Sequence, residues 1–213
     1  MSTTTDGAAP PSLRLLGTTT SPYVRKVRIL LAAAQLPFDF VDTRHDAGAD
    51  LLARFAPVGK VPVLLLGGAG GGSPDQVLPD SSLIAQWLWT GHQPALRAAG
   101  FLLDPEMWDQ RARQVVVEGA LDAAINRFYL TRDGFSETGY LARQRDRVEA
   151  ALRALDGAVT FRRPCDVATL SLGCALDWMV FREQVDLGRF PGLATFRQAW
   201  AASGVGAGTE PAS

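Results

Sequence analysis

LRLLGTTTSPYVRKVRILLAAAQL, residues 13–36, is the stretch that decides the fold. The short apolar run at residues 13–16 is typical of a buried strand, and Gly17 ends it before four successive hydroxyl residues, Thr18 to Ser21. Pro22 then opens a segment in which apolar residues recur with the period of a helix, and proline is well tolerated at the first helical position. The stretch therefore predicts a strand, a loop and a helix.

Ser21 stands where a helix N-cap belongs, because its hydroxyl can accept a hydrogen bond from a free N–H of the first turn. A helix start combines unpaired N–H groups with about half a positive charge, and Arg25, Lys26 and Arg28 add cations within two turns. Such surroundings favour an anion and lower the pKa of a thiol, which is about 8.5 when free. Ser21 is therefore either a simple helix cap or a residue that stabilises a bound thiolate.

Composition excludes several classes of function. With 213 residues, 47% of them hydrophobic, the chain can form one large domain or two small ones with an ordinary core. A net charge of −1 gives no electrostatic footprint for nucleic acid or an anionic membrane. The apolar runs are far shorter than the roughly 20 residues of a membrane span, and residues 1–12 lack signal-peptide features. We expect a cytoplasmic protein with no nucleic-acid or membrane partner.

Cysteine and histidine usage argues against a metal or redox centre. Cys165 and Cys174 lack the spacing of a zinc or dithiol motif, and two thiols fit a reducing compartment. His45 and His92 stand in no cluster typical of metal ligands. We therefore expect no metal, and we expect both cysteines to be buried apolar filler.

Strands continue after the opening stretch. Residues 38–42, FDFVD, alternate as a half-buried strand does, and the strand–helix–strand unit that they complete favours a parallel pair. A short helix is expected at residues 50–55. The run VGKVPVLLL, residues 58–66, predicts a strand with Pro62 at its start or edge. A cis bond before Pro62 would turn the backbone N–H and C=O of Val61 outward as an edge for a peptide, whereas a trans proline would only start the strand.

A glycine-rich connection follows at residues 67–75. It lacks the spacing of a phosphate-binding loop, so we expect a long hairpin loop that leads to a strand at residues 76–78. Asp80 or Ser81 then begins a helix whose apolar residues recur at helical spacing. An acid and a hydroxyl at a helix start either cap the helix or bind an amino group and a carboxylate.

The second half of the chain has a helical pattern alone. The inner face of its first helix is expected to carry Met107, Trp108, Val115, Ala120, Leu121, Ile125 and Phe128 or Tyr129. Ser136 should cap the second helix, and Asp166 with Thr169 should form an approximate capping box in the third. We expect helices at residues 104–130, 136–155, 166–183 and 191–202. The chain then divides into a disordered tail at 1–11, an α/β domain at 12–91, a linker at 92–103, an all-helical domain at 104–202 and a disordered tail at 203–213.

Three motifs stand in a familiar order: SPYVRKVR at residues 21–28, GKVPVL at 59–64 and PDS at 79–81. A fourth stretch, LGCALDW at 172–178, has the pattern of a buried nucleating helix. With them, residues 13–202 resemble a cytosolic glutathione S-transferase of the serine type found in bacteria. The resemblance implies an α/β thioredoxin-like N-terminal domain of order βαβαββα followed by an all-α C-terminal domain.

The resemblance also implies a thiol-activating residue and a substrate. Ser21 matches the position that activates the thiol of glutathione, with Thr19 and Thr20 as alternates. No cysteine stands there, which argues against mixed-disulfide chemistry. The activated thiolate would attack a small hydrophobic electrophile held between the domains. The pocket for that electrophile is expected to draw on Thr19, Trp108, Arg111 and Val115.

Glutathione itself would lie along the first domain. By the same resemblance, Val61 and Pro62 match the cis-proline turn that pairs with the cysteinyl backbone. Asp80 and Ser81 match the pair that holds the γ-glutamyl end, and Lys60 would reach the glycyl carboxylate.

The resemblance leaves the reaction open. The main expectation is a transferase that uses glutathione as co-substrate and acts as a homodimer, with the first domain of one subunit against the helices of the other. The alternatives are a non-catalytic glutathione-transferase-like binding or regulatory protein, and a glutathione-dependent isomerase or peroxidase that uses the same site.

Overall fold

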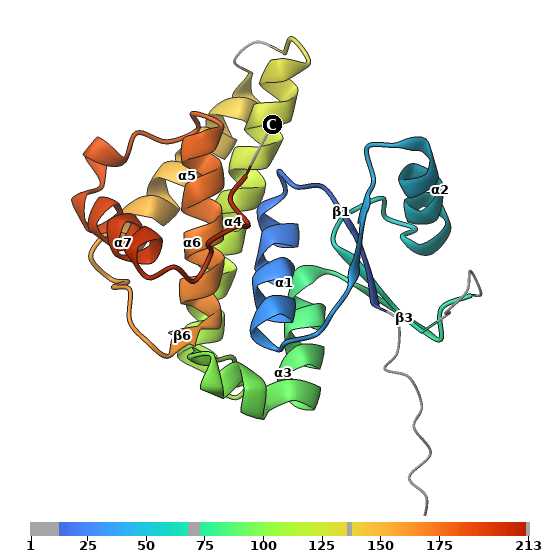
Figure 1. Cartoon of the computed structure of the whole chain (residues 1–213). Coiled ribbons are helices and arrows are strands. Elements are labelled where there is room, and N and C mark those ends of the chain that lie inside the picture. The colour runs from blue at the N-terminus through green and yellow to red at the C-terminus, as the bar shows by residue number, and fades with distance from the viewer. Residues whose placement is uncertain (1–12, 68–72, 136–137, 212–213) are drawn as a thin grey trace, which may run out of the picture.

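The computed structural model describes residues 13–67, 73–135 and 138–211 (Figure 1). The tail expected at residues 1–11 and the middle of the glycine-rich hairpin loop lie outside these ranges. Two parts pack side by side in Figure 1: a sheet flanked by helices, and a bundle of longer helices. None of the helices in the described ranges is long and apolar enough to cross a membrane.

The first part has the expected thioredoxin-like order of elements. Its four-stranded sheet has the order β2-β1-β3-β4, with β2 parallel to β1 and the β3 and β4 strands antiparallel to their neighbours. The elements are β1 (Leu13–Gly17), α1 (Pro22–Ala33), β2 (Asp39–Asp42), α2 (Asp46–Phe55), β3 (Val63–Leu66), β4 (Gln76–Pro79) and α3 (Ser81–Ala98).

The central strands are buried on both faces, which explains their continuous apolar sequence. Leu15 and Leu64 point into the large core with α1 and α3. Leu16, Val63 and Leu65 point the other way, into a smaller core under α2. Figure 1 accordingly shows α2 alone on the side of the sheet away from α1 and α3. This layering places the start of α1 at the boundary with the helical bundle.

Two local predictions in this domain need correction. The helix expected at residues 50–55 begins at Asp46, because Gly48 lets its first turn approach the end of β2: a Cβ at Gly48 would lie 2.1 Å from the Asp42 carbonyl oxygen. The linker expected at residues 92–103 is mostly regular structure. Helix α3 continues to Ala98, with a kink at His92 two residues before Pro94, where proline interrupts the helical hydrogen bonds.

A short parallel pair of strands follows, β5 (Phe101–Leu102) with β6 (Cys165–Asp166), and it ties the start of the bundle to the start of its central helix. The four predicted long helices are confirmed, with α6 almost completely buried. They are α4 (Trp108–Arg132), α5 (Gly139–Leu155), α6 (Val167–Phe181) and α7 (Pro191–Ala202), with a 3₁₀ turn at Leu187–Arg189.

The predicted cap of α6 is confirmed, whereas the cap of α5 is a different residue from the one predicted. The Asp166 carboxylate accepts a hydrogen bond from the Thr169 N–H at 2.7 Å, as the predicted capping box requires. Thr138 caps α5 by accepting from the Leu141 N–H, whereas the expected cap, Ser136, lies outside the described residues.

The predicted buried face of α4 is confirmed in the second half of the helix, where Ala120 and Leu121 are buried, and it is wrong in the first half. Trp108 and Val115 are 72% and 70% exposed. The buried stripe runs through Gln110, Gln114, Val117, Leu121 and Ala124, which share one helical face. The two glutamines concealed its first half, and the Gln114 amide donates to the Ser82 hydroxyl of α3 at 2.8 Å and to Glu118 at 2.9 Å.

The C-terminal segment was expected to be disordered, yet residues 203–211 form turns packed against α1 and α7. The Arg25 guanidinium, on a side chain only 3% exposed, donates to Thr209 Oγ1 at 3.1 Å and to the Gly206 carbonyl at 3.4 Å. Arg28 donates to the Gly208 carbonyl at 3.4 Å. Buried or half-buried arginine side chains of α1 therefore hold the segment in place.

Candidate functional site

The start of α1 is built as the sequence predicted. Ser21 adopts an extended backbone, and its Oγ accepts a hydrogen bond from the Val24 N–H at 3.3 Å, while Pro22 begins the helix. Because the hydroxyl uses a lone pair for this bond, its own hydrogen remains available to a second partner. Ser21 is half-buried and lines a cavity between the two domains.

This cavity, here named the aromatic cavity, has a volume of about 390 Å³. The first domain contributes the loop before α1 and the turn before β3, and the bundle contributes the second half of α4 and the end of α6. Its lining residues are Thr18, Thr20, Ser21, Pro22, Tyr23, Gly59, Lys60, Val61, Asp122, Ile125, Asn126, Phe128, Tyr129, Trp178 and Arg182.

A smaller pocket of about 200 Å³, here named the Asp80 pocket, adjoins the aromatic cavity. The two share four lining residues, so they are parts of one cleft. The lining residues of the Asp80 pocket are Tyr23, Val58, Lys60, Val61, Pro62, Pro79, Asp80, Glu118 and Asp122. The Val61–Pro62 peptide bond, which the sequence left open, is cis.

Asp80 is held in an unusual backbone conformation. Its φ is +74°, a region that non-glycine residues rarely adopt and that costs about 1 kcal/mol or more. Its N–H donates to the Pro62 carbonyl at 3.2 Å, and its carboxylate caps α3 by accepting from the Ser82 N–H at 2.7 Å. Asp80 thus lines the pocket, and hydrogen bonds hold both its backbone and its carboxylate in place.

The structure brings together most of the predicted site. Ser21, Thr20, Lys60 and Val61 line the aromatic cavity, and Lys60, Val61, Pro62 and Asp80 line the adjoining pocket. Ser81, in contrast, is buried and lines neither.

The structure does not bring the residues predicted for the electrophile pocket to the aromatic cavity. Thr19 does not line the cavity, and its hydroxyl accepts a hydrogen bond from Arg44 at 3.4 Å. Trp108, Arg111 and Val115 do not line the cavity, because they belong to the first half of α4. Even Val115 precedes Asp122 by seven residues, or about 10 Å along the helix.

Tyr23 lines both parts of the cleft, but its phenol is no candidate base. Its hydroxyl donates to the Asp122 carboxylate at 2.6 Å, which joins α1 to α4. Burial raises the pKa of Tyr23 far above its ordinary value, and the bond to Asp122 raises it further. The phenol therefore stays protonated and acts as a hydrogen-bond donor.

Lys26 and Arg25, two of the cations expected to support a thiolate, instead form ion pairs between the domains. Lys26 is only 1% exposed, and its Nζ lies 2.6 Å from Glu118 of α4. Glu118 also accepts from Gln114 at 2.9 Å and lies within 3.4 Å of the Ser82 hydroxyl. Burial alone would raise the pKa of Glu118, but Lys26 and the hydrogen bonds outweigh that effect and lower it. Lys26 is thus neutralised at the domain boundary.

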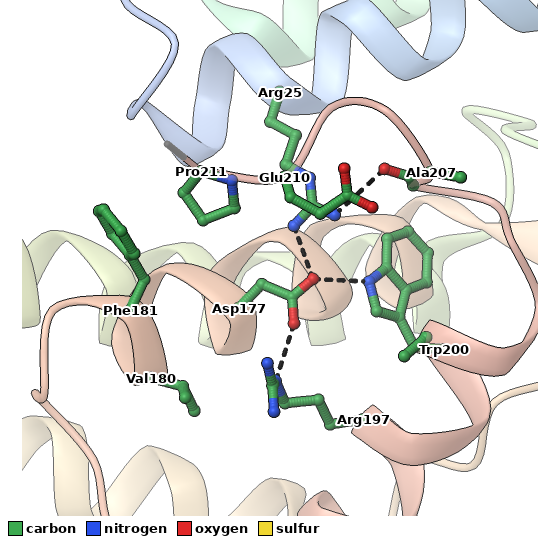
Figure 2. Close-up of a pocket in the computed structure, with 11 residues that line it drawn as sticks. Arg25, Asp177, Val180, Phe181, Arg197, Trp200, Ala207, Glu210 and Pro211 are labelled. Carbon is green, nitrogen blue, oxygen red and sulfur yellow. Dashed lines mark hydrogen bonds and ion pairs between the residues drawn. The ribbon is translucent and has the colours of Figure 1, made fainter. Parts of the chain in front are cut away.

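Arg25 is neutralised in the same way, beside a second cavity of about 340 Å³ (Figure 2). Its Nη1 lies 2.6 Å from the Asp177 carboxylate, which also accepts from Arg197 Nε at 2.8 Å and Trp200 Nε1 at 3.0 Å. Figure 2 shows these three donors converging on one carboxylate beneath the C-terminal segment. We name this cluster the Asp177 clamp, since it joins α1, α6 and α7.

The sequence did not identify the cation that α6 contributes. Arg182 lines the aromatic cavity one helical turn after Trp178, whose ring makes an edge contact with Phe128 at 5.7 Å between centroids. One signal was available: the helix is apolar around its first three turns, and Arg182 is the first cation to follow it.

The thiols and metal ligands add no further site. Cys165 and Cys174 are buried, and burial raises the pKa of Cys174 to about 12, so neither is a reactive thiolate. Within the ranges that the structure covers, no three His, Cys, Asp or Glu residues are grouped to hold a metal ion.

Comparison with known proteins identifies the family. Residues 15–95 match the family model of the glutathione S-transferase N-terminal domain. The chain is 30% identical to a glutathione S-transferase from Methylobacterium radiotolerans crystallised with glutathione sulfonate, over 95% of this chain and 96% of that one, with a TM-score of 0.76. The chain therefore belongs to the cytosolic glutathione S-transferase family.

Two further relatives agree with this assignment. A glutathione S-transferase from Methylobacillus flagellatus with glutathione bound is 27% identical, with a TM-score of 0.77 over 94% of this chain and 100% of that one. The uncharacterized GST-like protein YibF of Escherichia coli is 28% identical over 80% of this chain and 83% of its own length.

Proposed function

We propose that the protein is a glutathione transferase that binds glutathione in the Asp80 pocket and conjugates it to an electrophile in the aromatic cavity. The observation that carries the proposal is the continuity of the cleft from Asp80, past Val61, to the Ser21 hydroxyl. The glutathione or glutathione sulfonate bound in the two solved relatives supports the choice of ligand.

Each part of glutathione has a complementary group in the cleft. The γ-glutamyl amino group would bind the Asp80 carboxylate, and its carboxylate would face the first N–H groups of α3, that of Ser81 included. The cysteinyl backbone would pair with Val61. Lys60 lines both parts of the cleft and has no ion pair with any described residue, so it is available to the glycyl carboxylate.

The thiol would then lie at the start of α1. The Ser21 hydroxyl, already fixed by the Val24 N–H, would donate its hydrogen to the sulfur, and the helix end would favour the thiolate. Thr20 also lines the cavity and remains the alternate donor. The thiolate would attack the electrophilic carbon, forming a C–S bond while the leaving group departs with its electron pair.

Substitution of Ser21 tests this assignment. With glutathione and chlorodinitrobenzene, S21A should lower kcat by about 10- to 100-fold at neutral pH, because the bound thiol loses a hydrogen bond to its ionised form. T90A is the matched control, since the Thr90 hydroxyl lines neither part of the cleft and donates to the Gln86 carbonyl of its own helix at 3.0 Å. Full activity of S21A would refute the serine mechanism, and no activity of the native protein on halide, enone or hydroperoxide acceptors would favour a non-catalytic binding protein.

We also propose a homodimer. The first half of α4 presents an apolar strip to solvent, with Trp108 at 72%, Val115 at 70% and Val116 at 39% exposed, and Leu83 of α3 is 44% exposed. Sedimentation velocity should give twice the chain mass at micromolar concentration, and a monomer at that concentration would contradict the proposal.

A further inference from the structure

The Arg182 guanidinium is held by aromatic rings at the wall of the aromatic cavity. Its Cζ lies 4.6 Å from the centroid of the Phe181 ring and 5.0 Å from that of Phe128. Stacking of this kind orients a planar guanidinium and leaves its in-plane N–H groups free for other partners. Because Arg182 also caps the C-terminal end of α6, its backbone is fixed as well.

No hydrogen bond or ion pair joins the Arg182 guanidinium to any residue that the structure describes, and its Nε is buried from solvent. The side chain as a whole is half-buried, and its buried Nε–H is an unsatisfied donor, which is costly. A ligand that carries an acceptor would satisfy it.

The charges around the cavity favour an anion. Among its lining residues, Lys60 and Arg182 are the cations and Asp122 is the one carboxylate, already bonded to the Tyr23 hydroxyl. Glutathione, as placed above, engages Lys60 with its glycyl carboxylate. Arg182 is then left for a group on the other substrate.

We propose that the electrophilic substrate carries a carboxylate on an aromatic or similarly flat framework, and that Arg182 binds this carboxylate. The inference rests on the proposed transferase function and specifies its substrate class. Trp178, Phe128 and Tyr129 supply the flat apolar walls. In the reaction, the thiolate sulfur bonds to the ring carbon that bears a halogen, the carbon–halogen bond breaks, and halide leaves with the electron pair while the carboxylate is unchanged.

The test compares two glutathione conjugates that differ only in charge: one made from a chlorodinitrobenzoate with its carboxylate para to the chlorine, the other from the corresponding benzamide. Calorimetry should show the native protein binding the carboxylate conjugate about 10- to 100-fold more tightly, as expected for a charge-assisted hydrogen bond. In R182Q this ratio should fall to about 1, and R182K should restore part of it.

Arg143 of α5 provides the matched control, because its guanidinium also lies over an aromatic ring, 6.0 Å from the Tyr140 centroid, but does not line the cavity. R143Q should keep the native ratio. Equal binding of the two conjugates by the native protein would overturn the inference while leaving the transferase proposal intact. An equal loss of affinity for free glutathione and for both conjugates in R182Q would assign Arg182 to the glutathione site and also overturn it. If the native protein bound neither glutathione nor either conjugate, both proposals would fall.

Discussion

The two cavities at the domain boundary use charge in opposite ways. In the Asp177 clamp, one carboxylate accepts bonds from Arg25, Arg197 and Trp200, so the charges of Arg25, Arg197 and Asp177 are paired with one another. In the aromatic cavity, Lys60 and Arg182 have no carboxylate partner in the described part of the chain. The difference indicates that paired charges fix the two domains against each other, whereas unpaired charges mark the place for a ligand.

Removal of the clamp carboxylate should give the largest effect. In D177A, the buried Arg25 loses its ion pair and Trp200 loses its acceptor, so the free energy of unfolding should fall by about 3 to 5 kcal/mol. Urea denaturation followed by circular dichroism measures the loss. R197Q is the control, because it removes the more exposed of the two arginine partners of Asp177. It should lower the free energy of unfolding by about 1 kcal/mol. Similar stability of D177A and the native protein would show that the clamp does not fix the domains.

Removal of the second carboxylate at the boundary, Glu118, should give the next largest loss of stability, and this loss should depend on pH. E118Q leaves Lys26 without an ion pair, and we expect a loss of about 2 to 3 kcal/mol at pH 7. Because the pKa of Glu118 is lower in the folded protein, its stabilisation is complete above the ordinary glutamate range, near pH 5, and is lost as the pH falls toward the folded pKa.

Denaturant titrations from pH 7 to pH 3 measure this dependence. The difference in stability between the native protein and E118Q should therefore shrink as the solution is acidified. A difference that stays constant over that range would contradict the lowered pKa of Glu118.

The smallest expected effect is that of the Tyr23 hydroxyl. Y23F removes its bond to Asp122 and should cost about 0.5 to 1.5 kcal/mol of stability. Because the pKa of Tyr23 is raised far above neutral, the pH profile of kcat with chlorodinitrobenzene should keep the same midpoint. A midpoint that moves by a full pH unit in Y23F would make Tyr23, rather than Ser21, the group that sets the thiol pKa.

Much of the fold was predictable because its signals are local. Strand and helix periods, the Ser21 and Asp166 caps and the position of Pro62 each depend on a few neighbouring residues, and they located the first-domain half of the cleft. The partners of the charged residues were not predictable in this way. Arg25 pairs with Asp177 and Lys26 pairs with Glu118, and these partners lie 152 and 92 positions away along the chain.

The same reason explains the errors on α4. Gln110 and Gln114 belong to the buried stripe, and Gln114 is satisfied by the Ser82 hydroxyl at 2.8 Å, on a helix of the other domain. Apolar periodicity places Phe128 inward correctly, but it also places Trp108 and Val115 inward, and both are exposed. Only the packing of α4 against α3 and α1 reveals that Asp122 faces the cleft.

The most direct test of the account is a titration of the native protein with glutathione by calorimetry, with the ultraviolet absorbance of the bound thiolate followed from pH 5 to pH 9. The account predicts binding, with the thiolate signal rising at a pH about two units lower than for free glutathione. It also predicts that S21A binds glutathione while the signal returns toward the free value. Binding with no shift of the thiolate signal in the native protein would contradict activation at Ser21.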